Sequence, residues 1–233
     1  MMLTLSDGRT VRPLQPAQDF KRAADGDAGP NTGGMGAYTP LPWAPSDLVA
    51  EVTRTVLQPT VDELARRGTP FAGLLYAGLA LTARGVRVIE FNARFGDPET
   101  QPLLARLRTP LSPLLHAAAT GTLADHPELE WSDDAAVAVV LAAGGYPGTP
   151  RSGDVVTGLN APSSDAASVV QAGTALDDGG RVVSAGGRVL AVVGTGPVLG
   201  AARDAAYARM ATLGLEGSFY RTDIAAAVAE KQG

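Results

Sequence analysis

The sequence predicts an α+β fold in which antiparallel β-ribbons pack against a few helices. Short apolar runs follow one another through glycine-containing turns, a pattern typical of hairpins. Helical periodicity is confined to residues 46–68, 111–120 and 197–213. A polar connector precedes a change to short strands with glycine turns, so we expect two domains, residues 1–130 and 131–233.

Length and composition are those of an ordinary globular protein. A chain of 233 residues that is 45% hydrophobic can bury a sizeable core. The net charge of -5 argues against nucleic acid or an anionic membrane as the main partner. No apolar run approaches the roughly 20 residues of a membrane span. The absence of cysteine excludes a disulfide framework and fits the cytoplasm, which is the predicted location.

The chain begins with a predicted hairpin. Its strands lie at residues 2–5 and 10–14, and Asp7-Gly8 is a strong turn signal between them. A two-stranded ribbon is only marginally stable alone, so its partner strands either come later in the chain or are missing from the front.

A glycine-rich loop over residues 25–38 follows a small basic cluster, Lys21 and Arg22. Three of its glycines, Gly33, Gly34 and Gly36, together cost roughly 2 kcal/mol relative to alanine. One interpretation is a run of backbone N–H groups that closes on an anionic ligand beside the basic cluster. The other is a turn-rich linker, and a glycine pattern alone does not decide between them.

The next elements are a helix and a hairpin. The helix is expected from Ser46, a good N-cap, to Gly68, with a kink or break at Pro59. Residues 71–82 form a nearly continuous apolar run, which predicts a strand buried on both faces. The chain then turns back into the strand that contains residues 88–92, so we expect a central hairpin and not an exposed edge.

That second strand carries the most suggestive chemistry. Strict alternation would place Ile89, Phe91 and Phe95 on the core side and Val88, Glu90, Asn92 and Arg94 on the other. Two oxygen ligands followed by a guanidinium can hold a divalent cation and steady a transferring phosphoryl group. The alternative is an exposed strand face with a local ion pair. The polar turn at residues 96–101 favours a functional site, because such turns often carry function.

The remaining sequence predicts a smaller α+β domain. Strands are expected at residues 135–143, 169–172, 181–184 and 188–193, with Gly186-Gly187 as a hairpin turn. The helix over 197–213 is expected to bury, among others, the following side chains: Ala201, Ala205, Tyr207, Ala208 and Met210.

Two long motifs carry a resemblance to a known enzyme family. Residues 29–38 (GPNTGGMGAY) and 90–101 (EFNARFGDPETQ) resemble the phosphoribosylamine–glycine ligases of the ATP-grasp superfamily. The similarity continues through residues 143–147 and 186–190 to the C-terminal helices. It implies the C-terminal part of an ATP-grasp domain, an antiparallel sheet with helices, followed by a small α+β C-terminal domain.

The resemblance also implies an activity. Members of the family join glycine to 5-phosphoribosylamine through a glycyl phosphate intermediate, and they release ADP and phosphate in de novo purine biosynthesis. The implied partners are ATP, glycine and 5-phosphoribosylamine, and the implied cofactor is Mg²⁺ or Mn²⁺. Oligomeric state is left open.

The family's functional positions fall on particular residues of this chain. Glu90 and Asn92 would be the metal ligands, and Arg94 would be the catalytic arginine that meets phosphoryl or acyl-phosphate charge. The implied substrate-binding residues are Asp19, Lys21, Arg22, Pro30, Asn31, Thr32, Gly33, Gly34, Met35, Gly36 and Asp97.

The sequence departs from the family at two places. Phe20 stands where the family usually has histidine, between Asp19 and Lys21. The resemblance also begins at residue 1 in the middle of the family's chain, so we expect an N-terminally truncated protein that is inactive alone. Two alternatives remain: a non-catalytic fragment or binding module, and another ATP-grasp carboxylate–amine ligase.

Overall fold

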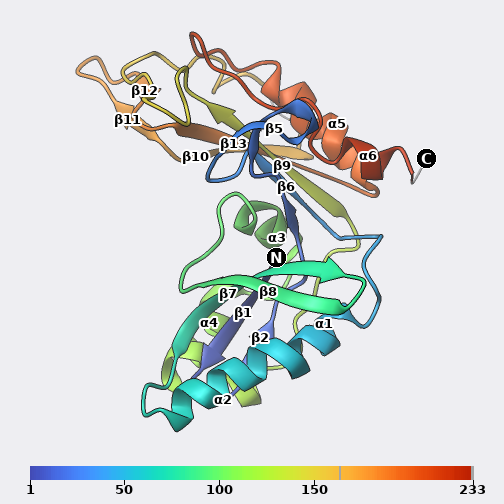
Figure 1. The fold of residues 1–233 in the computed structure, drawn as a ribbon. Coiled ribbons are helices and arrows are strands. Elements are labelled where there is room, and N and C mark those ends of the chain that lie inside the picture. Colours follow the sequence, from blue (N-terminus) through green and yellow to red (C-terminus); the bar gives the residue numbers. More distant parts are fainter. Residues whose placement is uncertain (163, 232–233) are drawn as a thin grey trace. The chain divides into compact units, whose positions relative to one another are not determined.

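A computed structural model describes residues 1–162 and 164–231, and its mixed helices and antiparallel sheets confirm the predicted α+β class (Figure 1). The chain packs into two compact units that alternate along the sequence. Unit 1 contains Met1–Ala17, Pro40–Gly96 and Leu107–Ser132. Unit 2 contains Gln18–Thr39, Asp97–Arg106 and the described residues of Asp133–Gly233. The linear division at residue 130 stays a prediction.

Unit 1 is built on a four-stranded antiparallel sheet. Its strand order is β2 (Val11–Pro13), β1 (Met2–Asp7), β7 (Ala72–Thr82) and β8 (Gly85–Asn92). The predicted hairpin between β1 and β2 is confirmed. Its turn is closed by Asp7, whose Oδ1 accepts the Thr10 N–H at 2.7 Å, as short acidic side chains commonly do in turns.

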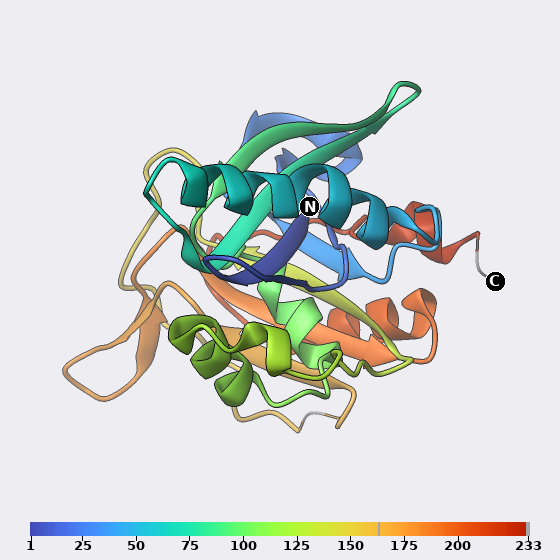
Figure 2. The ribbon, with the colours of Figure 1, turned by 90° about the horizontal axis from the view of Figure 1, so that it is seen from below.

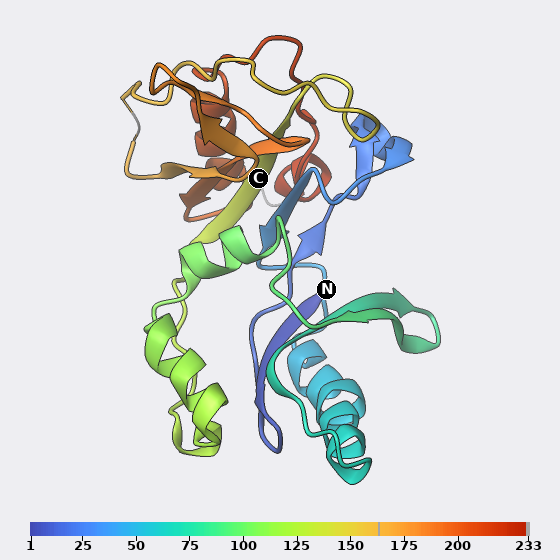
Figure 3. The ribbon, with the colours of Figure 1, turned by 90° about the vertical axis from the view of Figure 1, so that its left-hand side faces the viewer.

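Helices cover both faces of this sheet (Figure 3). The predicted helix is split into α1 (Leu48–Val52), a π-helical turn (Thr53–Leu57) and α2 (Gln58–Arg66), and Pro59 lies in the first turn of α2, where no N–H is needed. The buried core of this face consists of Met2, Val11, Leu48, Val52, Leu57, Val61, Leu75 and Ala77. Helix α4 (Leu111–Thr120), also predicted, packs on the opposite face.

Strand β8 is an edge strand, which corrects the expectation of a central hairpin. Among the described strands, only β7 pairs with β8. Strand β1 pairs only with residues 72–77 of β7, so the outer part of the β7–β8 hairpin has no further neighbour in the sheet. Residues 81 and 82 of β7 are consequently exposed, and the strand is fully buried only in its middle.

A β-bulge in β8 also changes which side chains share a face. Gly78 pairs with Glu90 and Leu79 pairs with Val88, so Ile89 is the extra residue. The predicted alternation is therefore wrong at this point. Val88 and Phe91 line one groove with α2, whereas Ile89 is 68% exposed and not in the core.

Unit 2 is built on a five-stranded sheet. The strand order is β10 (Ala167–Gln171), β13 (Arg188–Gly196), β9 (Ala135–Ala142), β6 (Gly36–Thr39) and β3 (Gln18–Asp19). Every residue of β9 is buried, because the strand lies between two others and under a helix. Two ribbons complete the strands, β4 (Arg22–Ala24) with β5 (Ala28–Asn31), and β11 (Thr174–Leu176) with β12 (Val182–Ser184).

Helix α5 (Leu199–Met210) packs on β13 and β9. Met210 is buried as predicted, but the rest of the buried face differs from the prediction. Ala202 and Ala206 are buried, whereas Ala208 is exposed. A Cβ atom at Gly194 of β13 would lie 2.1 Å from the Ala202 carbonyl oxygen, so this glycine lets the helix backbone approach the strand and sets its rotation.

Unit 2 also contains α3 (Thr100–Arg106) and α6 (Ala226–Ala229). Helix α3 was not predicted, because its start lies within the polar turn that follows β8. Among the described residues, no helix has both the length and the apolar character needed to span a membrane.

Candidate functional site

The candidate residues fall in both units, so each group is described within its own unit. Glu90, Asn92 and Arg94 belong to unit 1. Asp97 and the candidates between residues 19 and 36 belong to unit 2.

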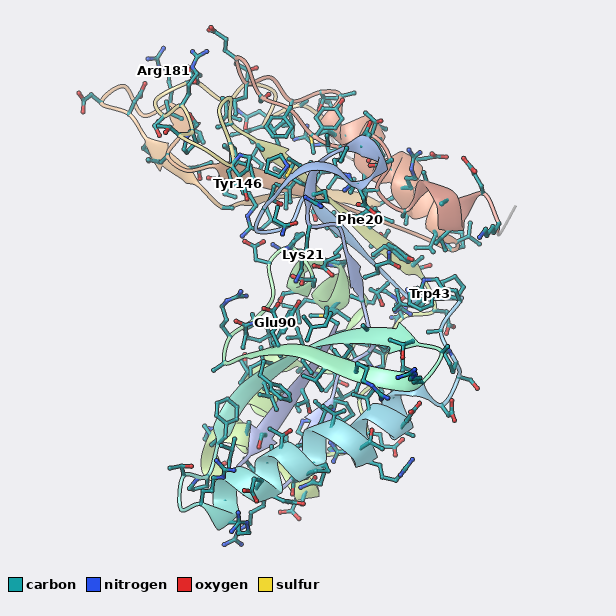
Figure 4. The ribbon with its side chains drawn as sticks, viewed as in Figure 1. Phe20, Lys21, Trp43, Glu90, Tyr146 and Arg181 are labelled. Atoms are coloured by element: carbon teal, nitrogen blue, oxygen red, sulfur yellow. The ribbon has the colours of Figure 1, made fainter. Side chains whose placement is uncertain are left out.

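Glu90 and Asn92 lie beyond the bulge of β8, two residues apart and therefore on one side of the strand. Figure 4 labels Glu90. Glu90 lies across Gly78 of the neighbouring strand. A Cβ atom at Gly78 would be 2.9 Å from Glu90 Cγ and 3.5 Å from Glu90 Oε1. The missing side chain at residue 78 thus makes the space in which the candidate metal ligand lies.

The donor set of this pair fits a hard divalent cation. Mg²⁺ prefers oxygen ligands and is commonly held by one or two carboxylates while it keeps several waters. Among the described residues, no group of three or more His, Cys, Asp or Glu side chains could hold a metal ion. A bound ion would therefore need other oxygen ligands, such as water or substrate phosphate. Arg94 follows the strand, and its Nη1 donates to the Phe95 carbonyl at 2.8 Å.

The glycine-rich loop of unit 2 is closed by its own amides. The Thr32 N–H donates to the Lys21 carbonyl at 2.7 Å, and the Gly34 N–H donates to Thr32 Oγ1 at 2.9 Å. The Met35 N–H donates to the Phe20 carbonyl at 2.8 Å. These amides point to protein acceptors, so the interpretation of an open, anion-binding run of N–H groups is wrong for them.

One further amide of the loop donates to a residue outside this segment. The Gly33 N–H donates to the phenolic oxygen of Tyr146 at 2.8 Å. The remaining candidates of the loop lie in strands. Pro30 and Asn31 end β5 with exposed side chains, and Gly36 begins β6.

Asp97 is held from two sides. Its Oδ1 accepts a hydrogen bond from Gln101 Nε2 at 2.7 Å, and its Oδ2 lies 3.0 Å from Arg188 Nη2. Arg188 Nη1 donates to the carbonyls of Gly33 at 2.9 Å, Gly34 at 3.4 Å and Asp97 at 2.5 Å. The structure thus joins the glycine-rich loop to Asp97 through one guanidinium.

The basic cluster divides into two roles. Arg22 Nη1 donates to the Gly29 carbonyl at 2.7 Å and so closes the β4–β5 hairpin. Lys21 Nζ lies 3.9 Å from Asp19 Oδ2, and the lysine side chain is 50% exposed. Lys21 is the better placed of the two to meet a ligand.

Arg221 underlies this segment. Its side chain is 1% exposed and bonds to Asp27 Oδ1 at 2.8 Å, to both oxygens of Asp223 at 2.7 Å and to the Arg22 carbonyl at 3.1 Å. The hydrogen bonds from Arg221 lower the pKa of Asp223 to about 2, despite partial burial. The guanidinium lies 5.0 Å from the ring centroid of Phe20. An aromatic ring at residue 20 is therefore used in a cation–π contact.

Sequence reasoning assigned no role to Arg188, Tyr146 or Arg221. The first two lie in segments that carry the family resemblance, but their partners are remote, since Arg188 and Gly33 are 155 residues apart. No local pattern indicates such a pairing.

Two family models match the chain. Residues 1–100 match the phosphoribosylglycinamide synthetase ATP-grasp (A) domain, and residues 136–227 match the phosphoribosylglycinamide synthetase C domain. The chain is 66% identical over 231 residues to phosphoribosylamine–glycine ligase of Streptomyces coelicolor, covering 98% of this chain and 55% of that protein. It is 57% identical over 224 residues to the Mycobacterium bovis ligase, covering 96% and 52%.

Solved structures agree with these matches. The crystal structure of phosphoribosylamine–glycine ligase from Thermotoga maritima has a TM-score of 0.85 at 34% identity, covering 96% of this chain and 54% of that one. The biotin carboxylase domain of Hydrogenobacter thermophilus 2-oxoglutarate carboxylase has a TM-score of 0.68 at 12% identity, covering 94% and 46%, and this likeness concerns the fold alone.

The fold and the matched models define the chain as an ATP-grasp protein with a C domain of the synthetase type. Within that class, it belongs to the phosphoribosylglycinamide synthetase family, the phosphoribosylamine–glycine ligases. The chain spans about half the length of the curated relatives it matches, 55% of the Streptomyces coelicolor protein. The family resemblance drawn from the two motifs is confirmed.

Proposed function

We propose that this chain takes part in the ATP-dependent ligation of glycine to 5-phosphoribosylamine, which yields glycinamide ribonucleotide, ADP and phosphate in purine biosynthesis. The observation that carries the proposal is the 66% identity with a phosphoribosylamine–glycine ligase over 231 residues. A cytoplasmic location stays a prediction, as does the role of each site residue.

In the proposed reaction, Glu90 and Asn92 of β8 would hold the metal through a carboxylate and an amide oxygen. A Mg²⁺ or Mn²⁺ ion bound there would neutralise phosphate charge during phosphoryl transfer. Arg94 stabilises charge on the transferring phosphoryl group or on the acyl phosphate. Its position just beyond the strand supports this role.

The unit 2 residues bind the small substrates in this proposal. The segment from Asp19 to Gly36, together with Asp97, provides carboxylates, carbonyls and a lysine that is 50% exposed. A lysine ammonium suits the phosphate of 5-phosphoribosylamine, and carboxylates suit its amine or the amino group of glycine. The closed hydrogen bonding of the loop favours recognition by a preformed surface.

The test is a substrate-omission assay on the protein expressed from its native reading frame. We expect Mg²⁺-dependent ADP release only when ATP, glycine and freshly generated 5-phosphoribosylamine are all present. ADP release that does not require glycine would favour another ATP-grasp ligase. No substrate-dependent release from folded protein would favour a non-catalytic binding role.

A further inference from the structure

Arg188 begins β13 at a β-bulge. It pairs with Ala142 while Leu190 pairs with Leu141, so the strand register shifts between residues 188 and 190. Bulges redirect side chains away from the regular alternation. The guanidinium of Arg188 is directed to the glycine-rich loop and to Asp97, all within unit 2.

Both terminal nitrogens of the Arg188 guanidinium make contacts. Nη2 faces the Asp97 carboxylate at 3.0 Å, and Nη1 donates to the carbonyls of Gly33 and Asp97. The arginine side chain is only 22% exposed. Charge-assisted hydrogen bonds of a planar guanidinium are directional as well as strong, so they fix the loop and the turn in one arrangement.

Packing makes this arrangement specific for glycine on the loop. A Cβ atom at Gly33 would lie 2.9 Å from Arg188 Cζ, and one at Gly34 would lie 2.5 Å from Pro98 Cδ. Gly34 is therefore required by its positive φ of 118° and by the approach of Pro98, whereas a side chain at Gly33 would displace the Arg188 guanidinium. These close contacts offset the conformational cost of fixing glycines in a folded loop.

Tyr146 completes the set from a separate loop. Its phenolic oxygen accepts the Gly33 N–H at 2.8 Å, and its ring lies against Gly187, where a Cβ atom would be 2.3 Å from the ring. The residue next to Gly187 is Arg188 itself. Gly33 is thus held at its N–H by Tyr146 and at its carbonyl by Arg188.

We propose that Arg188 and Tyr146 are positioning residues for the small-substrate site, because they hold Gly33, Gly34 and Asp97 in the arrangement that binds glycine or 5-phosphoribosylamine. The inference rests on the proposed function for the identity of those substrates. The holding of the loop itself rests on the contacts alone, so it can be tested separately.

The experiment compares Arg188→Met and Tyr146→Phe with a matched control, Arg181→Met. Arg181 lies between β11 and β12, its side chain is 67% exposed, and its ion-pair partner is Asp177 at 2.7 Å. Tyr146→Phe removes one hydroxyl from a ring that stays in place, so it remains informative if Arg188→Met lowers the yield of folded protein.

The first readout compares changes in KM for each substrate with changes in kcat. It uses the protein expressed from its native reading frame. Loss of hydrogen bonds to charged groups should raise the KM for glycine or 5-phosphoribosylamine about tenfold or more in Arg188→Met, with the KM for ATP unchanged. Tyr146→Phe should raise the same KM about threefold. A purely structural role would lower the active fraction, and so kcat, without changing any KM.

The second readout is amide hydrogen exchange over residues 32–36, which does not depend on ligase activity. Both variants should exchange faster there than the wild type and the Arg181→Met control. Unchanged exchange in both variants would overturn the proposal, and so would faster exchange with every KM unchanged. If the wild type has no ligase activity, the proposed function fails, whereas unaltered exchange would still refute the holding of the loop.

Discussion

Two bulged strands, β8 in unit 1 and β13 in unit 2, each direct a candidate side chain, but their surroundings differ. Strand β8 has one neighbour in its sheet, and Glu90 lies over the bare backbone of Gly78. Strand β13 lies between β10 and β9, and Arg188 at its start bonds to Asp97 and to loop carbonyls. A β-bulge thus places Glu90 across from a glycine in unit 1, and it places Arg188 against carbonyl and carboxylate acceptors in unit 2.

The difference suggests two kinds of contribution to a site. A residue that binds an ion needs room and accessible oxygens, which an edge strand beside a glycine offers. A loop that recognises small substrates needs a fixed shape, which hydrogen bonds from several segments provide. Variants in the two units should therefore differ in whether they change stability or activity.

The largest expected effect is on the stability of unit 2. Arg221→Met would leave Asp27 and Asp223 without their buried cation, and we expect the free energy of unfolding to fall by about 3 kcal/mol. Arg181→Met, the control, removes an exposed ion pair and should cost less than about 1 kcal/mol. Denaturant unfolding at pH 7 measures both. Equal, small losses would show that unit 2 does not depend on its buried arginine.

The next effect is on catalysis from unit 1. In the complete ligase, Glu90→Gln should lower kcat about a hundredfold, because one anionic metal ligand is lost. The fold should be retained, since the buried core of unit 1 does not include this side chain. The matched control is Glu128→Gln, an exposed carboxylate in the connector. Near-normal turnover with an ordinary Mg²⁺ dependence in Glu90→Gln would contradict the assignment.

Part of the fold could be predicted from the sequence, and part could not. The hairpin turn at Asp7-Gly8 and the helices over residues 46–68 and 111–120 rest on local signals, and the structure contains them. The predicted hairpin turn at Gly186-Gly187 is wrong, because β12 pairs with β11 whereas β13 pairs with β10 and β9. The edge position of β8 could not be predicted, because it depends on which strands pair in the folded sheet, where β8 pairs with β7 alone. The alternation of side chains was predicted wrongly at the bulges, because one extra residue moves every later side chain to the opposite face of the strand.

The candidate site was also predictable only in part, because its contacts join distant parts of the sequence. The motifs identified Glu90, Asn92 and the loop residues by resemblance, and their roles stay predictions. The contacts that hold the loop join segments more than a hundred residues apart, such as Gly33 with Tyr146. Such pairs exist only in the folded chain, so no spacing in the sequence indicates them.

A smaller effect is the acid sensitivity of unit 2. The folded pKa of Asp223 is about 2, below the ordinary 3.8, so its pairing contributes stability above pH 4 that is lost as the pH falls towards 2. A shift of this size corresponds to about 2 kcal/mol. The difference in unfolding free energy between wild type and Asp223→Asn, measured from pH 7 to pH 2, should shrink across that window. A difference that does not vary with pH would refute this account.

The smallest expected effect concerns the space beside Glu90. Gly78→Ala would place a methyl group 2.9 Å from Glu90 Cγ and shift the carboxylate, so kcat should fall about tenfold with little loss of stability. Gly200→Ala in α5, where no atom lies within 4 Å of the added Cβ, serves as the control. Full activity in Gly78→Ala would show that Glu90 needs no such space.

The contrast between the two units is tested most directly by residue-resolved amide exchange of the unmodified chain. We expect the amides of β9 to exchange slowest, and those of Gly33 and Met35 to be protected by Tyr146 and Phe20. The amides of β8 that point away from β7 should exchange fastest. Loop amides that exchange as fast as those on the open side of β8 would contradict the claim that unit 2 presents a preformed loop.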